Sequence, residues 1–410
     1  MVAKKELARE ATGPLKGVRI LDLTSVVFGA YATQILADQG AEVIKLEDPG
    51  SKPNSGGDIM RWAGHVPDGA PRDLGAIFVT INRNKRSVSL DLKKPENQAR
   101  IRKLAATCDV VAASVRYEAL QRLGLDYESL KAVKPDIVYV HAAGYGSDGP
   151  YAGRPAYDDL IQAACGLADL LNRTDGNPRP RLMPTLLADK TAGLFMAQAV
   201  TAALFHKAQT GEGQFVEVPM LECITSFTLV EHYFEQVFEP PLGPWGYGRV
   251  CNPNRRPYET RDGFIGILPY TDAQWELFFQ VAGWTETIAK DPRFADPTAR
   301  SRNSHELYGL VDEVTRTRTT DEWFEILQKA GIPVERVNRL DDLEHDPHLE
   351  AVEFFQRYEH PQLGPYKQMK PPVRFAKTPA NIRRHPPRLG EHTDEILAEI
   401  EALGDERKGR

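Results

Sequence analysis

The 410-residue chain has only four cysteines, Cys108, Cys165, Cys223 and Cys251, and none belongs to a C-x-x-C pair. This spacing predicts neither a zinc site nor a disulfide framework, and it favours a reducing, cytoplasmic setting. No apolar run is long enough to span a bilayer, and residues 1–17 are polar and charged. We therefore expect neither a membrane helix nor a signal peptide.

An excess of basic charge is also lacking, because the formal net charge is -6 at pH 7. Such a chain offers no positive field to a nucleic-acid backbone or an anionic membrane, so neither partner is expected. The composition, 41% hydrophobic and 26% charged, is that of a globular enzyme. The length is enough for two or three domains with a large buried core.

What is present is an alternation of apolar strand-like runs with helix-like segments. Strands are expected at residues 18–23, 41–47, 109–113, 137–142 and 214–218, and helices at residues 29–39, 95–106 and 189–207. This β-α-β rhythm predicts an α/β fold with a parallel sheet covered by helices. The almost continuous apolar character of the strands suits central, buried positions.

Other stretches interrupt this rhythm. Residues 48–76 are rich in proline and glycine and predict a long loop, a feature that is often functional. Residues 238–258 predict a linker into a smaller domain that holds a strand at 263–268. A late strand is expected at 371–375, and a final helix after Thr393.

A glycine-rich motif, Gly144 to Gly149, follows a predicted strand and matches G-x-G-x-x-G. In dinucleotide-binding proteins this motif opens a helix whose N-terminus faces the pyrophosphate. Here Pro150, Gly153 and Pro155 follow at once, so a helix cannot begin. The context favours a glycine-rich active-site loop over NAD binding.

Asp189 precedes an apolar helical segment and allows two interpretations. Asp is a frequent helix N-cap. A carboxylate at a helix N-terminus also lies in a positive partial field, is expected to stay ionised, and in a dry pocket can attack a thioester. A G-x-S-x-G nucleophile motif is absent, and His345 and His348 flank a turn, so no metal pair is predicted.

Several motifs spread over the chain occur together in one known family. They lie at residues 14–24, 36–47, 82–87, 90–93, 144–151, 154–158, 189–193, 210–214, 291–294 and 389–393, the last reading Leu-Gly-Glu-His-Thr. In their order and number they resemble the class III CoA-transferases, the family of formyl-CoA transferase and crotonobetainyl-CoA:carnitine CoA-transferase. The resemblance covers nearly the whole chain.

The resemblance implies a Rossmann-like, parallel-sheet large domain formed by both chain ends, a smaller α+β middle domain, and a homodimer with interlocked chains. Residues 1–220 would form the N-terminal part of the large CoA-binding domain, with a linker helix at 221–240. Residues 241–335 would be the small domain, and residues 336–410 would return to the large domain.

The resemblance also implies site residues. Asp189 matches the nucleophile that becomes a covalent aspartyl-CoA, with an acyl-CoA and a carboxylic acid as small-molecule substrates and coenzyme A as substrate rather than a tightly bound cofactor. The matching CoA contacts are Val27, Leu90, Lys93, Ser114, Val115 and Arg122. Gly144, Tyr145 and Gly146 match the loop beside the acyl group, whose backbone N–H groups are candidate oxyanion donors.

The chain departs from the family pattern at three places. Many relatives carry Glu-Asn-Phe at residues 113–115, where this chain has Ala-Ser-Val, so a side-chain contact from Ser114 stays open. Formyl-CoA transferase has Gln at the position of Val27 and a tetraglycine loop at the stretch 251–257, which makes oxalate a less expected acceptor. Arg255 and Arg256 in that stretch either hold the distal carboxylate of a dicarboxylic acid such as succinate or pair at a domain boundary.

Two other functions share these features. The α-methylacyl-CoA racemases of the same superfamily use the His of a Gly-His-Asp motif as a base, and this chain has Ala156-Tyr157-Asp158 there. Tyr, with a pKa of about 10, is a poor base at neutral pH, so transfer is favoured over racemisation. A non-catalytic CoA-binding protein is disfavoured by Asp189 and the glycine loop.

Overall fold

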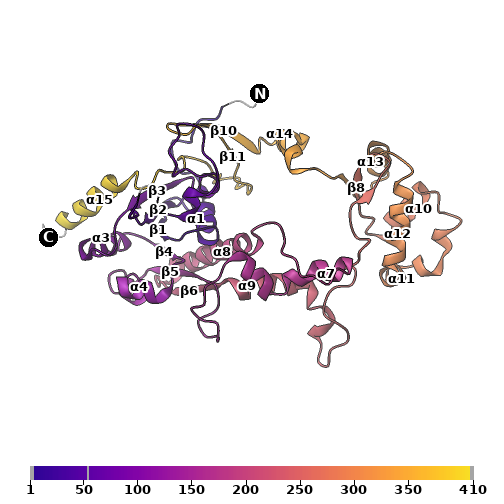
Figure 1. Cartoon of the computed structure of the whole chain (residues 1–410), viewed down its shortest axis with the longest axis horizontal. Helices are drawn as coiled ribbons and strands as arrows, with labels where there is room; N and C mark the ends of the chain where they lie inside the picture. The colour runs from indigo at the N-terminus through magenta and orange to yellow at the C-terminus, as the bar shows by residue number, and fades with distance from the viewer. Residues whose placement is uncertain (1–3, 53–54, 407–410) are drawn as a thin grey trace. The chain divides into compact units, whose positions relative to one another are not determined.

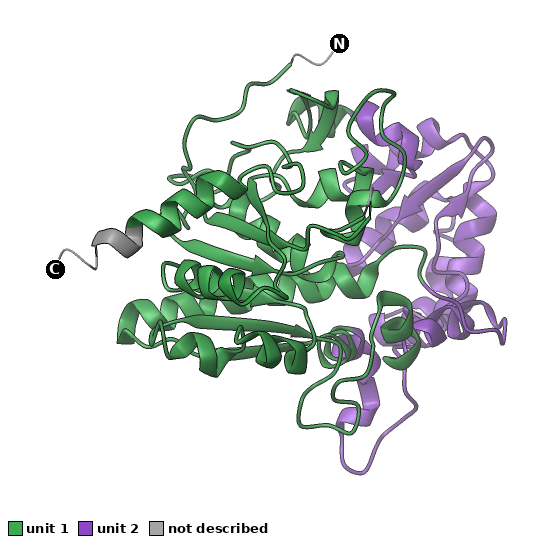
Figure 2. Cartoon of the chain, turned by 60° about the vertical axis from the view of Figure 1, so that its left-hand side comes forward, with its two compact units in different colours: residues 1–165, 183–227, 347–410 green, residues 166–182, 228–346 purple. Residues whose placement is uncertain are grey.

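The computed structural model describes residues 4–52 and 55–406. The chain forms two compact units (Figure 2). Unit 1 consists of residues 1–165, 183–227 and 347–410, and unit 2 of residues 166–182 and 228–346. The chain passes between the units after residues 165, 182, 227 and 346, whereas the predicted boundaries lie at 220, 240 and 335. The domain assignment stays a prediction.

Unit 1 is built on a six-stranded sheet in which each neighbouring pair is parallel. Its strands are β1 (Arg19–Leu23), β2 (Glu42–Glu47), β3 (Lys85–Ser89), β4 (Val110–Ala113), β5 (Val138–Ala143) and β6 (Phe215–Pro219), in the order β3-β2-β1-β4-β5-β6. The five strands predicted for this unit's sheet are confirmed to within one residue at each end. The predicted α/β class is therefore confirmed.

Helices cover both faces of this sheet. Those of unit 1 are α1 (Phe28–Asp38), α2 (Ala76–Ile81), α3 (Pro95–Ala105), α4 (Tyr117–Leu123), α5 (Tyr127–Lys131), α6 (Asp158–Ala164), α8 (Leu187–Thr210), α14 (Pro347–Ala351) and α15 (Thr393–Glu406). On one face, α3, α4, α5 and α15 close an apolar core against β1 to β5, and α15 lies beside α3 and β3 (Figure 1). On the other face, α1 packs along α8.

Strand β3 was not expected, because its residues are polar. Lys85 and Arg86 are nevertheless buried, since each finds acidic partners. The Lys85 ammonium lies 3.1 Å from Asp22, and Arg86 pairs with Glu395 and Glu399 of α15. Ion pairing therefore replaces apolar character as the reason for this strand's burial.

The late strand predicted at residues 371–375 is wrong. That segment is irregular, and Pro371 and Pro372 lack the backbone N–H that a strand needs. The strands of this region lie just before it, as an antiparallel hairpin of β10 (Phe355–His360) and β11 (Gly364–Met369).

Unit 2 combines a small antiparallel sheet with helices. Strands β7 (Tyr258–Glu259), β8 (Phe264–Ile267) and β9 (Val334–Arg336) pair in that order. The helices are α7 (Leu170–Asp175), α10 (Asp272–Val281), α11 (Pro297–Arg302), α12 (Ser304–Thr315) and α13 (Thr320–Lys329), and α9 (Met220–His232) contributes residues to both units. Its core is rich in aromatic side chains, among them Trp275, Phe278 and Trp323. Within the described parts of the chain, no helix has the length and apolar character needed to cross a bilayer.

Candidate active site

A cavity of about 550 Å³ opens in unit 1 at the carboxyl ends of β1, β4 and β5. Its wall includes Ser25 and Val26 after β1, Ser114 and Val115 after β4, and residues 141–145. The chain order of the strands reverses between β1 and β4, and ligands of open α/β sheets bind at such a switch point. Asp189 lines this same cavity.

Asp189 lies in the first turn of α8, not at its N-cap. The helix begins at Leu187, and Leu186 at the N-cap position gives no side-chain cap, so the predicted capping role of Asp189 is wrong. The carboxylate of Asp158 does this work instead, because its Oδ2 accepts the backbone N–H of Asp189 at 2.9 Å. One of the unpaired N–H groups of the first turn is thus satisfied from a different helix.

Gln162 holds the approach to α8 in the same way. Its Nε2 donates to Asp158 Oδ1 at 2.6 Å and to the Thr185 carbonyl at 3.1 Å, and its Oε1 accepts the Met183 N–H at 2.8 Å. The Gln162 side chain is fully buried. Helix α6 therefore fixes where α8 begins.

The electrostatics of Asp189 differ from the expectation that it stays fully ionised. The residue is 6% exposed, and its carboxylate accepts no hydrogen bond from any residue that the structure describes. Burial, followed by the negative charges of Asp158 and Asp159, raises the pKa of Asp189 to about 7. Both effects disfavour the ionised form, so the carboxylate is more basic than an ordinary aspartate.

Helix α8 contacts the first turn of α1 closely, one turn after Asp189. Gly193 lies one turn after Asp189, on the same face of α8. A Cβ atom on Gly193 would lie 2.9 Å from the Phe28 carbonyl oxygen, too close for an ordinary contact. Phe28 lines the cavity, so α8 and the first turn of α1 approach as closely as a residue without a side chain permits.

The glycine-rich loop does not open a helix. Turns follow β5, and the next helix, α6, begins only at Asp158, so the dinucleotide interpretation is excluded by geometry. Gly144 and Tyr145 line the cavity. The Gly146 N–H donates to Glu222 at 2.8 Å, and the Ser147 N–H to Glu217 at 3.0 Å. An oxyanion contact from Gly146 would require Glu222 to release that N–H.

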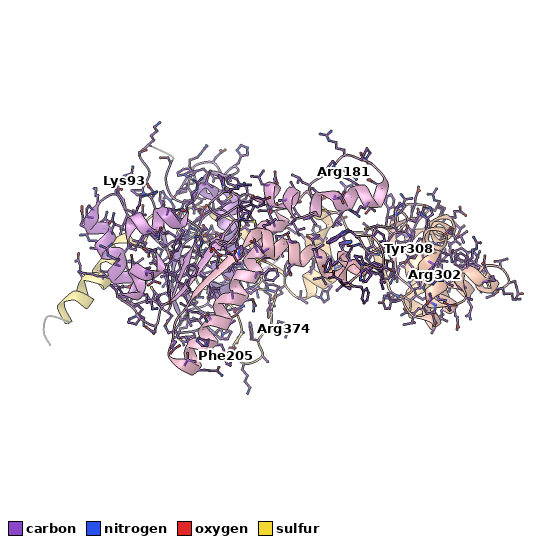
Figure 3. All side chains as sticks on the ribbon, turned by 90° about the horizontal axis from the view of Figure 1, so that it is seen from below. Lys93, Arg181, Phe205, Arg302, Tyr308 and Arg374 are labelled. Carbon is purple, nitrogen blue, oxygen red and sulfur yellow. The ribbon has the colours of Figure 1, made fainter. Side chains whose placement is uncertain are left out.

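The CoA contacts inferred from the resemblance fall into two groups. Ser114 and Val115 line the cavity, and the Ser114 Oγ accepts the Ser25 N–H at 3.1 Å. Val27 packs in a small apolar cluster with Ala30 and Ile81, and Leu90 belongs to the main core. Lys93 and Arg122 are exposed and outside the cavity wall, with Lys93 at the periphery of the unit (Figure 3). Their roles stay predictions.

Two cationic side chains of the cavity wall were missed from the sequence. Arg116 and Arg154 both line the cavity and are exposed. Arg116 forms no ion pair with a described residue, and the Arg154 guanidinium lies 4.2 Å from the centroid of the Tyr151 ring. Arg154 stands in a motif that carried the resemblance, whereas Arg116 follows Ser114 and Val115 without a motif of its own.

Unit 2 has a separate cavity of about 390 Å³. Arg255 and Arg256 line it, together with Trp275, Tyr308 and Glu335. Arg256 lies 3.6 Å from Asp312, and Arg255 has no ion-pair partner among the described residues. Among residues 4–52 and 55–406, no group of three or more His, Cys, Asp or Glu side chains is arranged to hold a metal ion.

Comparison with known proteins identifies the family of this chain. The model of CoA-transferase family III matches residues 15–393. The chain belongs to this family. It is therefore a CoA-transferase, an enzyme that uses CoA thioesters as substrates.

Named relatives span almost the same length. The succinate–glutarate CoA-transferase of Agrobacterium fabrum is 31% identical over 95% of this chain and 96% of its own. The formyl-CoA:oxalate CoA-transferase of Afipia carboxidovorans is 31% identical over 94% of this chain and 93% of its own. Among solved structures, a CAIB/BAIF family protein from Brucella suis superposes with a TM-score of 0.77 at 30% identity, covering 95% of this chain and all of that one.

Proposed function

We propose that this family III CoA-transferase moves CoA from an acyl-CoA to a carboxylic acid through a covalent aspartyl-CoA thioester on Asp189. The observation that carries this proposal is the Asp189 carboxylate itself. It is nearly buried, lines the cavity at the switch point of the sheet, and accepts no hydrogen bond from the described residues. A buried carboxylate that accepts no hydrogen bond has no evident structural role, and its oxygen atoms are available to attack a thioester.

The reaction proceeds through acyl exchange on this carboxylate. An Asp189 oxygen attacks the thioester carbonyl carbon and expels the CoA thiolate, which gives a mixed anhydride. The thiolate then attacks the aspartyl carbonyl, releases the donor acid as its carboxylate, and leaves aspartyl-CoA. The acceptor carboxylate attacks this thioester, and the same steps in reverse yield the new acyl-CoA and free Asp189. No proton or electron is gained or lost overall.

The surroundings of Asp189 suit this sequence of steps. The near-complete burial of Asp189 limits the access of water, which would otherwise hydrolyse the anhydride and the thioester. Arg116 and Arg154 supply positive charge at the cavity wall, and we assign them to the phosphates of CoA, which guanidinium groups bind through charge-assisted hydrogen bonds. Tyr157, 64% exposed at this wall, occupies the place of the racemase histidine.

We infer that the acids exchanged include a dicarboxylic acid. The named succinate–glutarate relative supports this class. In unit 2, taken by itself, Arg255 lines a cavity beside Arg256 and has no ion-pair partner among the described residues. An arginine without an ion-pair partner can bind a second carboxylate in bidentate fashion. The interlocked homodimer and the cytoplasmic setting belong to the same proposal. Exposed apolar side chains on α8 and α9, among them Phe205 and Val230, support a partner chain.

Mass spectrometry of the trapped enzyme tests the nucleophile. Incubated with succinyl-CoA, the wild-type protein should carry a CoA-sized adduct on the peptide that contains Asp189. Asp189→Ala should lose both adduct and transfer while still binding CoA. Asp159→Ala removes an exposed carboxylate that does not line the cavity, and it should keep the adduct. Transfer by the wild-type protein without an adduct, or by Asp189→Ala, would refute the proposal.

A further inference from the structure

The turn between β1 and α1 contains a strained residue at the cavity wall. Val26 has a φ of 65° and lines the same cavity as Asp189. A β-branched residue rarely adopts this left-handed conformation, which persists only where the surroundings impose it. Some group must therefore hold Val26 in place.

Asp58 is the group that holds it. Its Oδ1 accepts the Val26 N–H at 3.0 Å, although the two residues are 32 positions apart. Its Oδ2 lies 3.0 Å from the Lys45 ammonium, and Lys45 in turn donates to the Thr24 carbonyl at 2.6 Å. The side chains of Asp58 and Lys45 are both fully buried. One ion pair thus ties down the turn on both sides of Ser25.

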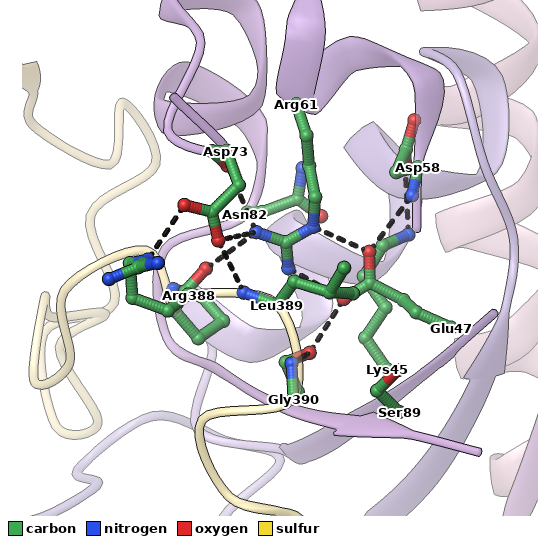
Figure 4. Close-up of polar contacts among 12 residues, drawn as sticks. Lys45, Glu47, Asp58, Arg61, Asp73, Asn82, Ser89, Arg388, Leu389 and Gly390 are labelled. Atoms are coloured by element: carbon green, nitrogen blue, oxygen red, sulfur yellow. Dashed lines mark hydrogen bonds and ion pairs between the residues drawn. The ribbon is translucent and has the colours of Figure 1, made fainter. Parts of the chain in front are cut away.

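Asp58 is itself held by a second ion pair (Figure 4). Its backbone N–H donates to Glu47 Oε1 at 2.9 Å. Glu47 accepts two hydrogen bonds from Arg61, at 2.7 and 2.6 Å, and Arg61 also donates to the Pro387 carbonyl at 2.9 Å. The long loop after β2 and the C-terminal segment are therefore both anchored to the strand that carries Lys45 and Glu47.

Stability alone does not account for this arrangement. A buried ion pair contributes little net stability relative to apolar side chains of the same volume, because desolvation offsets the attraction. Apolar side chains, however, cannot accept the Val26 N–H. Asp58 Oδ1 also accepts the Met60 N–H at 3.0 Å and so caps the short helix at residues 59–62, but that local task does not require a bond to Val26, 32 positions away at the cavity wall.

We propose that Asp58 is a positioning residue for CoA transfer, acting through Val26 to fix the cavity wall formed by Ser25, Val26 and Phe28. This inference rests on the proposed reaction at Asp189. It predicts that loss of the Asp58 carboxylate slows acylation of Asp189 without removing it. A wall displaced by about 1 Å can slow a reaction about a hundredfold, because reacting atoms must meet within a narrow geometry.

Asp58→Ala tests this proposal against a matched control, because alanine leaves the Val26 N–H without an acceptor, whereas an asparagine amide oxygen could still accept it. Asp73 is another buried carboxylate of the same cluster, which bonds to Arg388 and the Leu389 N–H and lies 3.8 Å from Arg61. Among the described residues it forms no hydrogen bond or ion pair with residues 24–28. Both alanine variants should lower the melting temperature. Asp58→Ala should lower kcat and the rate of adduct formation on Asp189 by about tenfold or more, and Asp73→Ala should leave both within about twofold of wild type. Equal losses in the two variants, or a wild-type adduct rate in Asp58→Ala, would overturn the proposal.

A second variant separates positioning from folding. Asp58→Leu combined with Lys45→Met removes both charges together, the replacement that buried pairs tolerate best. This protein should keep its melting temperature within a few degrees and still lose about tenfold or more in kcat. A wild-type kcat in this stable double variant would overturn the inference. If instead wild-type enzyme turns over without an adduct, the reaction proposed for Asp189 fails, independently of Asp58.

Discussion

The Asp158 carboxylate and the backbone N–H of Asp189 lie 2.9 Å apart, joined by a hydrogen bond across 31 residues of chain. The Asp158 carboxylate acts on Asp189 in two ways. It satisfies the first turn of α8, and its negative charge adds to burial in raising the pKa of Asp189. Structure and reactivity at this site therefore depend on the same side chain.

Asp158→Asn should separate these two effects. The neutral amide removes a negative charge, so the pKa of Asp189 should fall from about 7 and Asp189 should ionise at lower pH. The acidic limb of the kcat/KM profile should move to lower pH, since this profile reports the free enzyme. The loss of one of two accepted hydrogen bonds should cost about 1 kcal/mol of stability. An unmoved acidic limb would show that Asp189 is not the group that titrates.

Asp189→Asn should stabilise the fold more at pH 8 than at pH 5. The pKa of Asp189 is raised from 3.8 to about 7 in the folded state. At pH 5 the folded state therefore still holds a proton that the unfolded state has already lost, and the folded state loses this proton as the pH rises through about 7. Wild-type stability therefore falls as the pH rises through this window, and the Asn variant escapes that loss. We expect a gain of about 2 kcal/mol at pH 8, or a few degrees in melting temperature. A difference that does not depend on pH would contradict the raised pKa.

Gly144→Ala should damage the cavity wall, whereas Gly149→Ala should not. A Cβ atom on Gly144 would lie 2.2 Å from the Cβ of Ala156, which must then move together with the loop that holds Tyr157. On Gly149 the nearest atom would be 3.7 Å away, an ordinary contact. We expect Gly144→Ala to lower the melting temperature and to cost at least about tenfold in kcat/KM, measured beside Gly149→Ala at near wild-type values. Equal behaviour of the two variants would mean that the loop relaxes freely.

Arg116→Gln should raise the KM for acyl-CoA by about tenfold, because a charge-assisted contact to phosphate contributes about 1.5 kcal/mol or more. Arg154→Gln should act in the same direction, with kcat little changed in both variants. Lys93→Gln and Arg122→Gln, at exposed positions outside the cavity wall, measure whether the outer part of CoA reaches them. A KM unaffected in Arg116→Gln would remove this residue from the CoA site.

Arg255→Gln should discriminate between acceptor acids. If Arg255 binds a distal carboxylate, the variant should lose about tenfold or more in kcat/KM with succinate or glutarate and little with a monocarboxylic acid. Arg302→Gln, at an exposed position of the same unit outside its cavity, serves as the control. Equal losses with both classes of acid would assign Arg255 a structural role.

The sheet of unit 1 was predictable because buried parallel strands are apolar, and four of its six strands follow this rule over most of their length. Strand β3 could not be found that way, since Lys85 and Arg86 are buried by pairing with residues distant in sequence. The hairpin β10–β11 was missed for a related reason. Its strands are largely polar and bury only Tyr358, His360 and Gln368, whereas the segment at 371–375 gave a stronger apolar signal.

The sequence analysis predicted Asp189 as the nucleophile, a role that stays a prediction, but it did not predict the environment of this residue. Asp189 was identified through family resemblance, whereas its local pattern suggested an N-cap. That interpretation failed because the acceptor for the first turn comes from Asp158 on a different helix. The contact of Asp58 with Val26 was equally hidden, since nothing near residue 26 shows that its N–H is paired with a distant carboxylate.

The contact at Gly193 has a consequence for how substrate range can change. Because no side chain separates α8 from the Phe28 carbonyl, a Cβ atom at position 193 cannot be accommodated unless one of the two helices moves. Any larger residue there would displace α8 together with Asp189, which lines the cavity one turn earlier. Selection for bulkier acids would therefore have to act on other residues of the cavity wall, where side chains can be exchanged without moving Asp189.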